Sequence, residues 1–208
     1  MLKEYLEKNY GYNEPIFINE IRLDGINDNA LRQYFKRMLK SGDLARFDTG
    51  IYYLPKASRL LNKSYLDPMK VIIRKYIQST TEVYGYFAGA TFANQIGLTT
   101  QMPATLEIIT SKEATKGRNV SIGSQTVRLK HPTVTITSEN VGLLQFLNAV
   151  SQAEKYSELS GAETGALLKN YAKQKNYSKA LLSGVLPGIT GSTAKKLIEW
   201  GIIYEFTS

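Results

Sequence analysis

Apolar residues in the first 55 positions recur at helical spacings and predict a small helical module. Leu2, Leu6 and Tyr10 fall on one face of a helix that ends at Gly11. The next stretch, EPIFINEI, favours a second short helix, because Pro15 is tolerated in a first helical turn, although the β-branched residues leave a short strand open. The pattern therefore favours two short helices before the main one.

The clearest helix of this module begins after Asn27 and Asp28, which follow a turn at Gly25 and supply an N-cap. Glycine at position 42 suits the left-handed conformation that ends a helix, and Lys40 in the last turn suits the helix dipole. Its apolar positions recur every three or four residues: Ala30, Leu31, Tyr34, Phe35, Met38 and Leu39. This stripe predicts a helix with one face packed on a core.

A two-stranded ribbon is expected after this helix. The segments LARF and IYYLP have strand character, and DTG between them supplies a tight turn. Three helices followed by a ribbon are the order of a winged helix-turn-helix. In that module the third helix lies in the major groove of DNA, and the ribbon lies along the backbone or the minor groove.

Polar residues line the outer face of the third predicted helix and the base of the ribbon. Arginine pairs bidentately with guanine, and glutamine or asparagine pairs with adenine, which is the chemistry that reads a DNA sequence. Five basic residues and one acid, Asp43, lie between positions 29 and 46. We therefore predict contacts with double-stranded operator DNA by Asn29, Arg32, Gln33, Lys36, Arg37, Lys40, Arg46 and Lys56.

Two observations weigh against this interpretation. Asp48 lies in the ribbon turn, where a carboxylate repels phosphate. A basic helix face is often only solvated, and winged helices also serve as protein-interaction modules. A non-enzymatic interaction module therefore stays open as the alternative function.

The remainder of the chain predicts a second domain. The basic segment KASRLLNKSYL, residues 56–66, predicts a connection between a winged helix-turn-helix domain at 1–62 and a domain at 67–208. A helix is predicted to start near Pro68, and the segment TEVYGYFAGATFANQIGL predicts a turn and then a helix that ends at Gly97. Gly85 and Gly89, four residues apart, predict close helix packing.

Strand patterns follow in the segments ATLEIIT, NVSIG and TVRLKHP, and they predict a small antiparallel sheet at 104–136. Helical stripes then recur in VGLLQFLNAV, AETGALLKNYAKQ, YSKALLSGVL and STAKKLIEWGII. The expected fold class is α+β: an N-terminal winged helix-turn-helix and a mixed α/β domain whose C-terminal part is helical.

Composition and charge narrow the function classes. Of the 208 residues 43% are hydrophobic and 21% charged, as in a folded globular protein. The net charge of +8 favours a polyanionic partner, and an anionic membrane surface also fits it. No run is long and apolar enough to span a membrane, and the start of the chain is too charged for a signal-peptide core, so we expect a cytoplasmic protein without a membrane partner.

Reactive side chains are too few for the common kinds of catalytic site. The chain has no cysteine and one histidine, His131, which excludes a thiol nucleophile and a site with two histidines. The acids are scattered, without an Asp-x-Asp pair for a two-metal site. We expect His131 at the surface or at a sheet edge, and we expect no enzyme activity, cofactor or metal.

Two further basic segments are candidates for a phosphate or partner contact. Lys112, Lys116 and Arg118 surround Gly117 in a predicted loop, where a solvated role is favoured. The segment LPGITGSTAKKL, 186–197, resembles the helix-hairpin-helix motif that binds nucleic-acid backbones, with Lys195 and Lys196 behind its glycines. Thr190 replaces the second glycine of that motif, and a glycine turn that joins the last two helices is favoured.

Two longer stretches carry a family resemblance that spans nearly the whole chain. These are LRQYFKRMLKSGDLARFDTGIYYLP at 31–55 and YGYFAGATFANQIGLTTQMP at 84–103, in which GLTTQMP is the more specific part. The chain resembles the AbiEi-like antitoxins of abortive-infection toxin–antitoxin systems and the related winged-helix regulators. The resemblance implies a DNA-binding antitoxin that represses its own operon, with a nucleotidyltransferase-like toxin as its partner. The family's ribbon tip is commonly basic, whereas Asp48 and Thr49 stand here.

Overall fold

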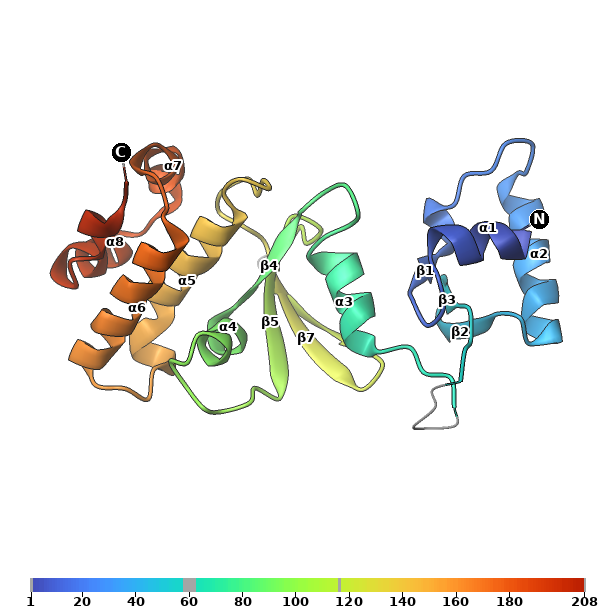
Figure 1. Cartoon of the computed structure of the whole chain (residues 1–208), viewed down its shortest axis with the longest axis horizontal. Helices are drawn as coiled ribbons and strands as arrows, with labels where there is room; N and C mark the ends of the chain where they lie inside the picture. Colours follow the sequence, from blue (N-terminus) through green and yellow to red (C-terminus); the bar gives the residue numbers. More distant parts are fainter. Residues whose placement is uncertain (1, 58–62, 116, 208) are drawn as a thin grey trace. The chain divides into compact units, whose positions relative to one another are not determined.

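The computed structural model describes residues 2–57, 63–115 and 117–207 and has an α+β fold (Figure 1). These residues form eight α-helices and two small sheets. The chain divides into two compact units, Met1–Arg74 and Lys75–Ser208, and the division falls inside helix α3 (Pro68–Tyr76), beyond the predicted connection. Residues 58–62 of that connection lie outside the described residues.

The first unit combines α1, α2 and most of α3 with a three-stranded antiparallel sheet of order β1-β3-β2. Its elements are α1 (Leu2–Asn9), β1 (Ile16–Phe17), the 3-10 turn η1 (Ile18–Glu20), α2 (Asp28–Ser41), β2 (Ala45–Asp48) and β3 (Ile51–Tyr53). The helix predicted in EPIFINEI is wrong. Ile16 and Phe17 instead pair with Tyr52 and Ile51 of β3, because this pairing buries both apolar side chains.

Helix α2 forms with the predicted caps. The Asn27 side chain accepts a hydrogen bond from the Ala30 amide at 2.9 Å, and Gly42 ends the helix in the left-handed region at φ +79°. The core beneath it consists of Leu6, Ile16, Ile21, Leu31, Phe35, Leu44 and Leu54. Tyr34, which was predicted to face this core, is 39% exposed, because it lies at the margin of the apolar stripe, under the guanidinium group of Arg37.

The second unit contains a four-stranded sheet against which α4 and α5 pack. Its elements after α3 (Pro68–Tyr76) are β4 (Gly85–Ala88), α4 (Gly89–Gln95), β5 (Thr105–Thr110), β6 (Arg118–Ile122), β7 (Gln125–Lys130), α5 (Val141–Tyr156), α6 (Gly161–Lys175), α7 (Lys179–Val185), the 3-10 turn η2 (Leu186–Gly188), α8 (Gly191–Glu199) and η3 (Ile202–Glu205). The segment TEVYGYFAGATFANQIGL was predicted to hold only a turn and a helix, and this is wrong for GYFA, because these residues form β4 and pair with β5.

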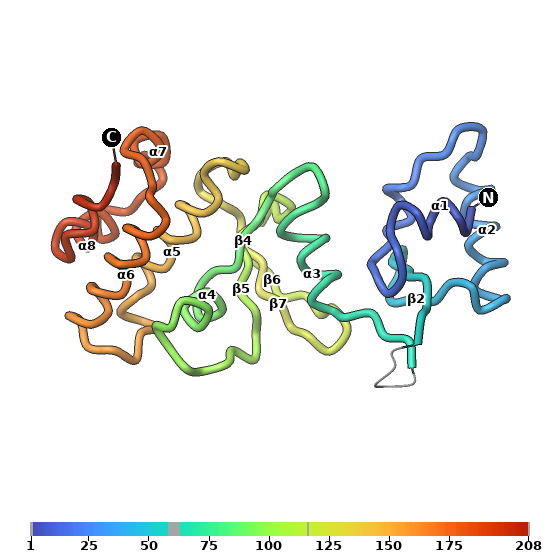
Figure 2. The backbone as a smooth tube through the Cα atoms, viewed as in Figure 1, coloured from blue at the N-terminus to red at the C-terminus, as the bar shows by residue number. Residues whose placement is uncertain are grey.

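The sheet of this unit is mixed, with strand order β4-β5-β7-β6. The three predicted strands are confirmed, but their purely antiparallel arrangement is wrong, since β5 and β7 are parallel. After β5 the chain crosses to the edge strand β6 and then turns back as β7, which therefore enters the sheet beside β5 in the same direction (Figure 2). A crossover of this kind leaves no local trace in the alternation of apolar residues.

Helix α5 lies at the centre of the second unit. It contacts β4 and α4 on the sheet side, and α6, α7 and α8 on the other (Figure 1). Most of its apolar residues are therefore buried, among them Leu143, Phe146 and Val150, each 0% exposed. Throughout the described ranges no helix has both the length and the apolar character needed to cross a bilayer.

Gly85 and Gly89 serve close approaches within the sheet layer, and the predicted packing of two helices at these glycines is wrong. A Cβ at Gly85 would lie 2.0 Å from the backbone oxygen of Tyr76. One at Gly89 would lie 2.2 Å from Oε1 of Glu107, and Gly89 also has a positive φ of +54°. Burial opposes ionisation of Glu107, but hydrogen bonds from Lys130 and Tyr156 outweigh it and lower the pKa of this carboxyl group.

Replacing Gly85 with alanine tests the close approach to Tyr76. We expect Gly85→Ala to reduce the free energy of unfolding by about 3 kcal/mol, because a backbone oxygen cannot move away as a flexible side chain can. Gly184→Ala is the matched control, since a Cβ at this position in α7 meets open space. We expect this substitution to increase the free energy of unfolding by at most about 1 kcal/mol. Urea denaturation followed by circular dichroism measures both. Equal effects of the two substitutions would contradict this packing.

Candidate nucleic-acid interface

Six polar residues of α2 share one exposed face. All are exposed, and their spacings of three, four and seven residues place them on the side away from the buried Leu31 and Phe35. They are Asn29, Arg32, Gln33, Lys36, Arg37 and Lys40. We call this set the α2 face. It contains four cationic side chains and two amides.

The cations of the α2 face are not neutralised by neighbouring acids. Among the residues with described positions, Arg32, Lys36, Arg37 and Lys40 form no ion pair. The guanidinium group of Arg37 lies 5.6 Å from the centre of the Tyr34 ring, which leaves its positive charge uncompensated. An anionic ligand therefore meets four unpaired positive charges.

Asp43, the acid that follows α2, is occupied elsewhere. Its carboxylate accepts hydrogen bonds from Lys3 at 2.7 Å and from the hydroxyl of Ser41 at 2.6 Å. These two bonds lower the pKa of Asp43 and hold it ionised. Lys3 thus compensates the acid of this stretch. The sequence pattern did not identify Lys3, because it lies 40 positions from Asp43.

The ribbon turn satisfies its own polar groups. The guanidinium group of Arg46 donates to the Asp48 carbonyl at 3.3 Å and to the Thr49 hydroxyl at 3.0 Å, and the Asp48 carboxylate accepts from the Thr49 amide at 2.6 Å. Arg46 therefore lies against the tip of the ribbon and offsets the charge of Asp48 there. The sequence analysis had instead predicted that Arg46 lies at the base of the ribbon.

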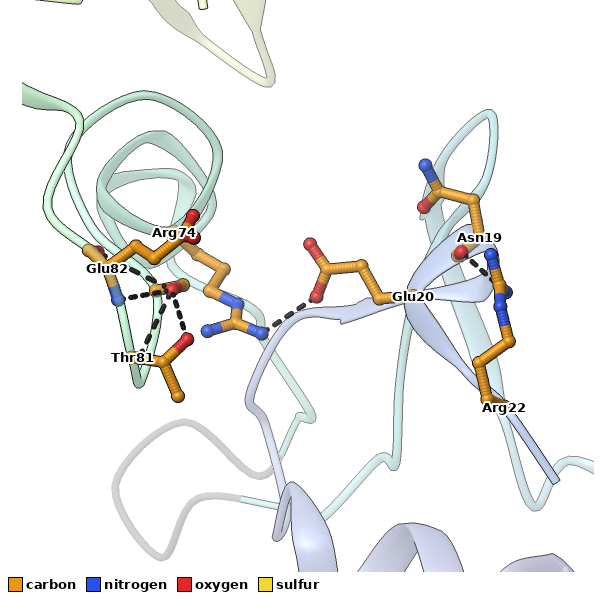
Figure 3. Close-up of polar contacts among 7 residues, drawn as sticks. Asn19, Glu20, Arg22, Arg74, Thr81 and Glu82 are labelled. Atoms are coloured by element: carbon orange, nitrogen blue, oxygen red, sulfur yellow. Dashed lines mark hydrogen bonds and ion pairs between the residues drawn. The ribbon is translucent and has the colours of Figure 1, made fainter.

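Two other cations of the first unit lie apart from the α2 face. Lys56 is placed beside the loop after α1, where its ammonium lies 5.1 Å from the centre of the Tyr12 ring and its backbone pairs with the Asn13 side chain. Arg22 donates to the backbone oxygen of Asn19 at 2.8 Å (Figure 3). It also donates to the backbone oxygen of Ile21 at 2.9 Å and so closes the η1 turn. Both side chains hold loops in place.

The predicted basic loop of the second unit is organised by a buried acid. Glu113 is only 2% exposed and accepts from the Thr115 hydroxyl at 2.6 Å and from Arg118 at 2.7 Å. The ammonium of Lys112 lies 4.6 Å from the centre of the Tyr84 ring. Lys116 lies outside the described residues. Arg118 is therefore partly neutralised, and this loop offers a weaker anion site than the α2 face.

The lysines of α8 differ from each other. Lys195 is exposed and lies 3.5 Å from Glu199, whereas Lys196 is 8% exposed, with its ammonium 3.3 Å from the Ser151 carbonyl and 3.2 Å from the Glu154 carboxylate. Lys196 therefore fastens α8 to α5 and is not open to solvent, as a phosphate or partner contact would require. A Cβ at Gly188 would lie 2.0 Å from Val134, so packing in the turn between α7 and α8 accounts for this glycine.

His131 is exposed at the end of β7, as predicted, and its Nδ1 lies 2.5 Å from the Glu113 carbonyl oxygen. In the part of the chain that the structure covers, no cluster of three or more His, Asp or Glu side chains could hold a metal ion.

The pKa of Glu113 gives a test of the loop that carries Lys112 and Arg118. Bonds from the Thr115 hydroxyl, the Thr115 amide and Arg118 lower this pKa to about 2. A carboxyl group with a lowered pKa in the folded state stabilises the protein above its unfolded pKa, near 4.5, and loses this contribution as the pH falls toward 2. We therefore expect the difference in Tm between the wild type and Glu113→Gln to be largest at pH 6 and to shrink between pH 4.5 and 2.5.

Thermal unfolding by circular dichroism at these pH values measures the effect, and the exposed Glu139→Gln is the matched control. A Tm difference for Glu113→Gln that stays constant with pH would contradict the assigned carboxylate contacts.

The comparisons with known proteins give a family without a described function. None of the curated proteins compared with the chain matches it. A family model described as a family of unknown function, DUF6088, matches residues 10–176, which include the α2 face, the ribbon and the second sheet. The chain therefore belongs to the DUF6088 family.

Proposed function

We propose that the first unit is a winged helix-turn-helix that binds operator DNA, and that the protein is an antitoxin that represses its own operon. The α2 face carries the DNA-binding part of this proposal: six exposed polar residues on one side of a capped helix, four of them cations without an acidic partner among the described residues.

The order of elements supports the winged-helix part. Helix α2 is followed directly by the β2–β3 ribbon, and β1 completes the three-stranded sheet. The turn η1 stands where a second helix was expected, so the module has one turn in place of that helix. The 14 residues of α2 are long enough to lie along a major groove, since a helix rises about 1.5 Å per residue.

The chemistry of the α2 face suits both kinds of DNA contact. Arg32 and Gln33 lie one turn from the N-terminus of α2, where a recognition helix meets base edges, and their side chains pair with guanine and adenine. Lys36 and Lys40 lie further along the same face, and we assign them to phosphate contacts that are independent of sequence. Base reading and backbone contact are thus divided along the helix.

The antitoxin part rests on the resemblance to the AbiEi-like family, and the segment GLTTQMP adds a structural argument. Glu158 holds this segment by accepting hydrogen bonds from the Thr100 amide at 2.7 Å and from the Gln101 side chain at 2.8 Å. Met102 at its end is 84% exposed. A large apolar side chain on a fixed loop suits contact with a protein, here the nucleotidyltransferase-like toxin.

One observation favours the second candidate, a protein-interaction module. Tyr34 is exposed beside Arg37 on α2, and both residue types are enriched at protein interfaces. DNA binding is separated from this alternative by its steep loss of affinity in salt and its preference for one site, since an interaction module shows neither.

The α2 face is tested by binding to a DNA site selected from a random library. We expect Arg32→Ala or Gln33→Ala to weaken binding at the preferred site by about 1 to 3 kcal/mol, because each loses a base contact. Lys36→Ala should weaken all sequences alike and reduce the salt slope by about 1, because it loses a phosphate contact. Fluorescence anisotropy at several salt concentrations measures both quantities.

The matched control is Arg128→Ala, which removes the same charge from an exposed position on β7 and should leave DNA binding unchanged. Equal affinities of the Arg32 and Gln33 variants and the wild type at the preferred site would refute the assignment of the reading face.

Neutralisation is tested by co-expression with the toxin encoded beside this protein. We expect the full chain to restore growth, and we expect a double variant with Arg32→Ala and Lys36→Ala to restore it as well, because toxin contact is assigned to residues 67–208. Growth curves give the measurement. Rescue by residues 1–62 alone, or loss of rescue in the double variant, would show that repression of the operon is the protective activity.

A further inference from the structure

We infer that a pocket in the second unit binds an uncharged, single-ring heterocycle of the pyrimidine-base type. The pocket has a volume of about 190 Å³ and lies between the sheet, α5 and the turn that joins α7 to α8. It uses no residue of the α2 face, so this inference is independent of the proposed DNA binding.

The size and the apolar walls of the pocket suit one ring. Leu144 and Leu147 of α5, with Val185 of α7, supply apolar surface. A cavity of about 150 Å³ lined by aliphatic and aromatic side chains accommodates one benzene molecule. The volume here therefore leaves room for a six-membered ring with small polar substituents, and it excludes a fused-ring ligand with a sugar inside the cavity.

The charge of the lining restricts the ligand further. Among the described residues that line the pocket there is no lysine, arginine, aspartate or glutamate. A buried charge without a counter-ion is costly, so a phosphate or an ammonium group does not belong inside this pocket. Its polar groups are hydroxyls, an amide and the His131 ring, which select an uncharged ligand that both donates and accepts hydrogen bonds.

Tyr86 lines the pocket with a hydroxyl that has no hydrogen-bond partner among the described residues. Its side chain as a whole is 8% exposed. Every buried side-chain nitrogen or oxygen atom of the described residues has a partner, so the unpaired Tyr86 hydroxyl is accessible from the pocket and free to bond a ligand. Burial also raises the pKa of Tyr86, which keeps the hydroxyl protonated and able to donate.

Two neighbouring side chains have their hydrogen-bonding roles fixed by existing contacts. Asn148 accepts from the Gly89 amide through Oδ1 at 3.2 Å, so its NH₂ group remains a donor. The Nδ1 atom of His131 lies against the carbonyl oxygen of Glu113, and a carbonyl oxygen can only accept a hydrogen bond. Nδ1 therefore carries the proton, and in the neutral ring Nε2 is then an acceptor. Apart from the threonine and serine hydroxyls of the lining, the pocket thus offers two donors, Tyr86 and Asn148, and one acceptor, His131.

A pyrimidine base matches this set. Uracil and thymine carry two carbonyl acceptors and ring N–H donors on one six-membered ring, without a charge at neutral pH. The carbonyls suit the Tyr86 hydroxyl and the Asn148 amide, and a ring N–H suits His131. Because His131 and Thr190 are exposed, a ribose attached to the base has a path to solvent on their side.

Saturation-transfer NMR on the full chain tests the inference with uracil, uridine and uridine monophosphate as probes. We expect all three to bind, and we expect uridine and its monophosphate to bind equally, because the pocket has no cation for the phosphate. Tyr86→Phe should weaken uracil binding roughly three- to tenfold, because one hydrogen bond to the ligand is lost. We expect this variant to remain folded. Leu147→Trp should abolish binding by filling the pocket.

Tyr204→Phe is the matched control, since it removes the same hydroxyl at a position that is 79% exposed. Competition by oligothymidylate would identify a nucleic-acid strand as the source of the base, and its absence would identify the free base or nucleoside; both outcomes support the pocket. No binding of uracil, an unchanged affinity in Tyr86→Phe, or monophosphate binding much tighter than uridine binding would each overturn the inference. Circular dichroism of each variant confirms that it is folded.

Discussion

The contact between Phe35 and Tyr52 fixes the direction in which α2 presents its charges. The ring centres lie 4.9 Å apart in an edge-on arrangement, and Phe35 is 1% exposed. Rotating α2 by one residue would expose this ring, at a cost of about 2 to 3 kcal/mol, and would also turn cationic side chains toward an apolar core. The α2 face is therefore held outward by the burial of an aromatic ring on its opposite side, and no polar contact is needed to orient it.

Local signals in the sequence predicted the elements that depend on neighbours within one turn. The Asn27 cap, the Gly42 end and the apolar stripe of α2 are of this kind, and all three are present. The errors lie where a distant segment decides the conformation. Residues 16–17 and 85–88 are strands because β3 and β5 offer them free edges, which overrides the helical tendency of the flanking sequence. The parallel pairing of β5 with β7 has the same origin, since only the crossover through β6 establishes it.

The features of the candidate site that depend on local sequence were likewise predictable, and those that depend on distant contacts were not. Exposure of the α2 residues followed from helical periodicity, because residues three and four positions apart share a face. Which charges remain free did not follow, because ion pairs join residues far apart in the chain. Lys3 neutralises Asp43, and Lys196 of α8 is buried against α5, where it pairs with Glu154. Net charge alone therefore overstates the anion-binding surface of the second unit and understates how completely the α2 face is left uncompensated.

The family match divides the pocket into two parts with different physical roles. The polar groups that select a ligand, Tyr86, His131 and Asn148, all lie within residues 10–176. The wall formed by Val185 and the turn before α8 lies beyond them. Selectivity arises from fixed donors and acceptors, whereas closure requires only apolar surface packed at the right distance. Lys196 fixes the separation of α8 from α5 by donating a hydrogen bond to the Ser151 carbonyl. Ser151 lies one turn from Asn148 on α5. The hydrogen-bonding chemistry of the pocket therefore belongs to the sheet and α5, and the C-terminal helices determine how tightly a ring is enclosed.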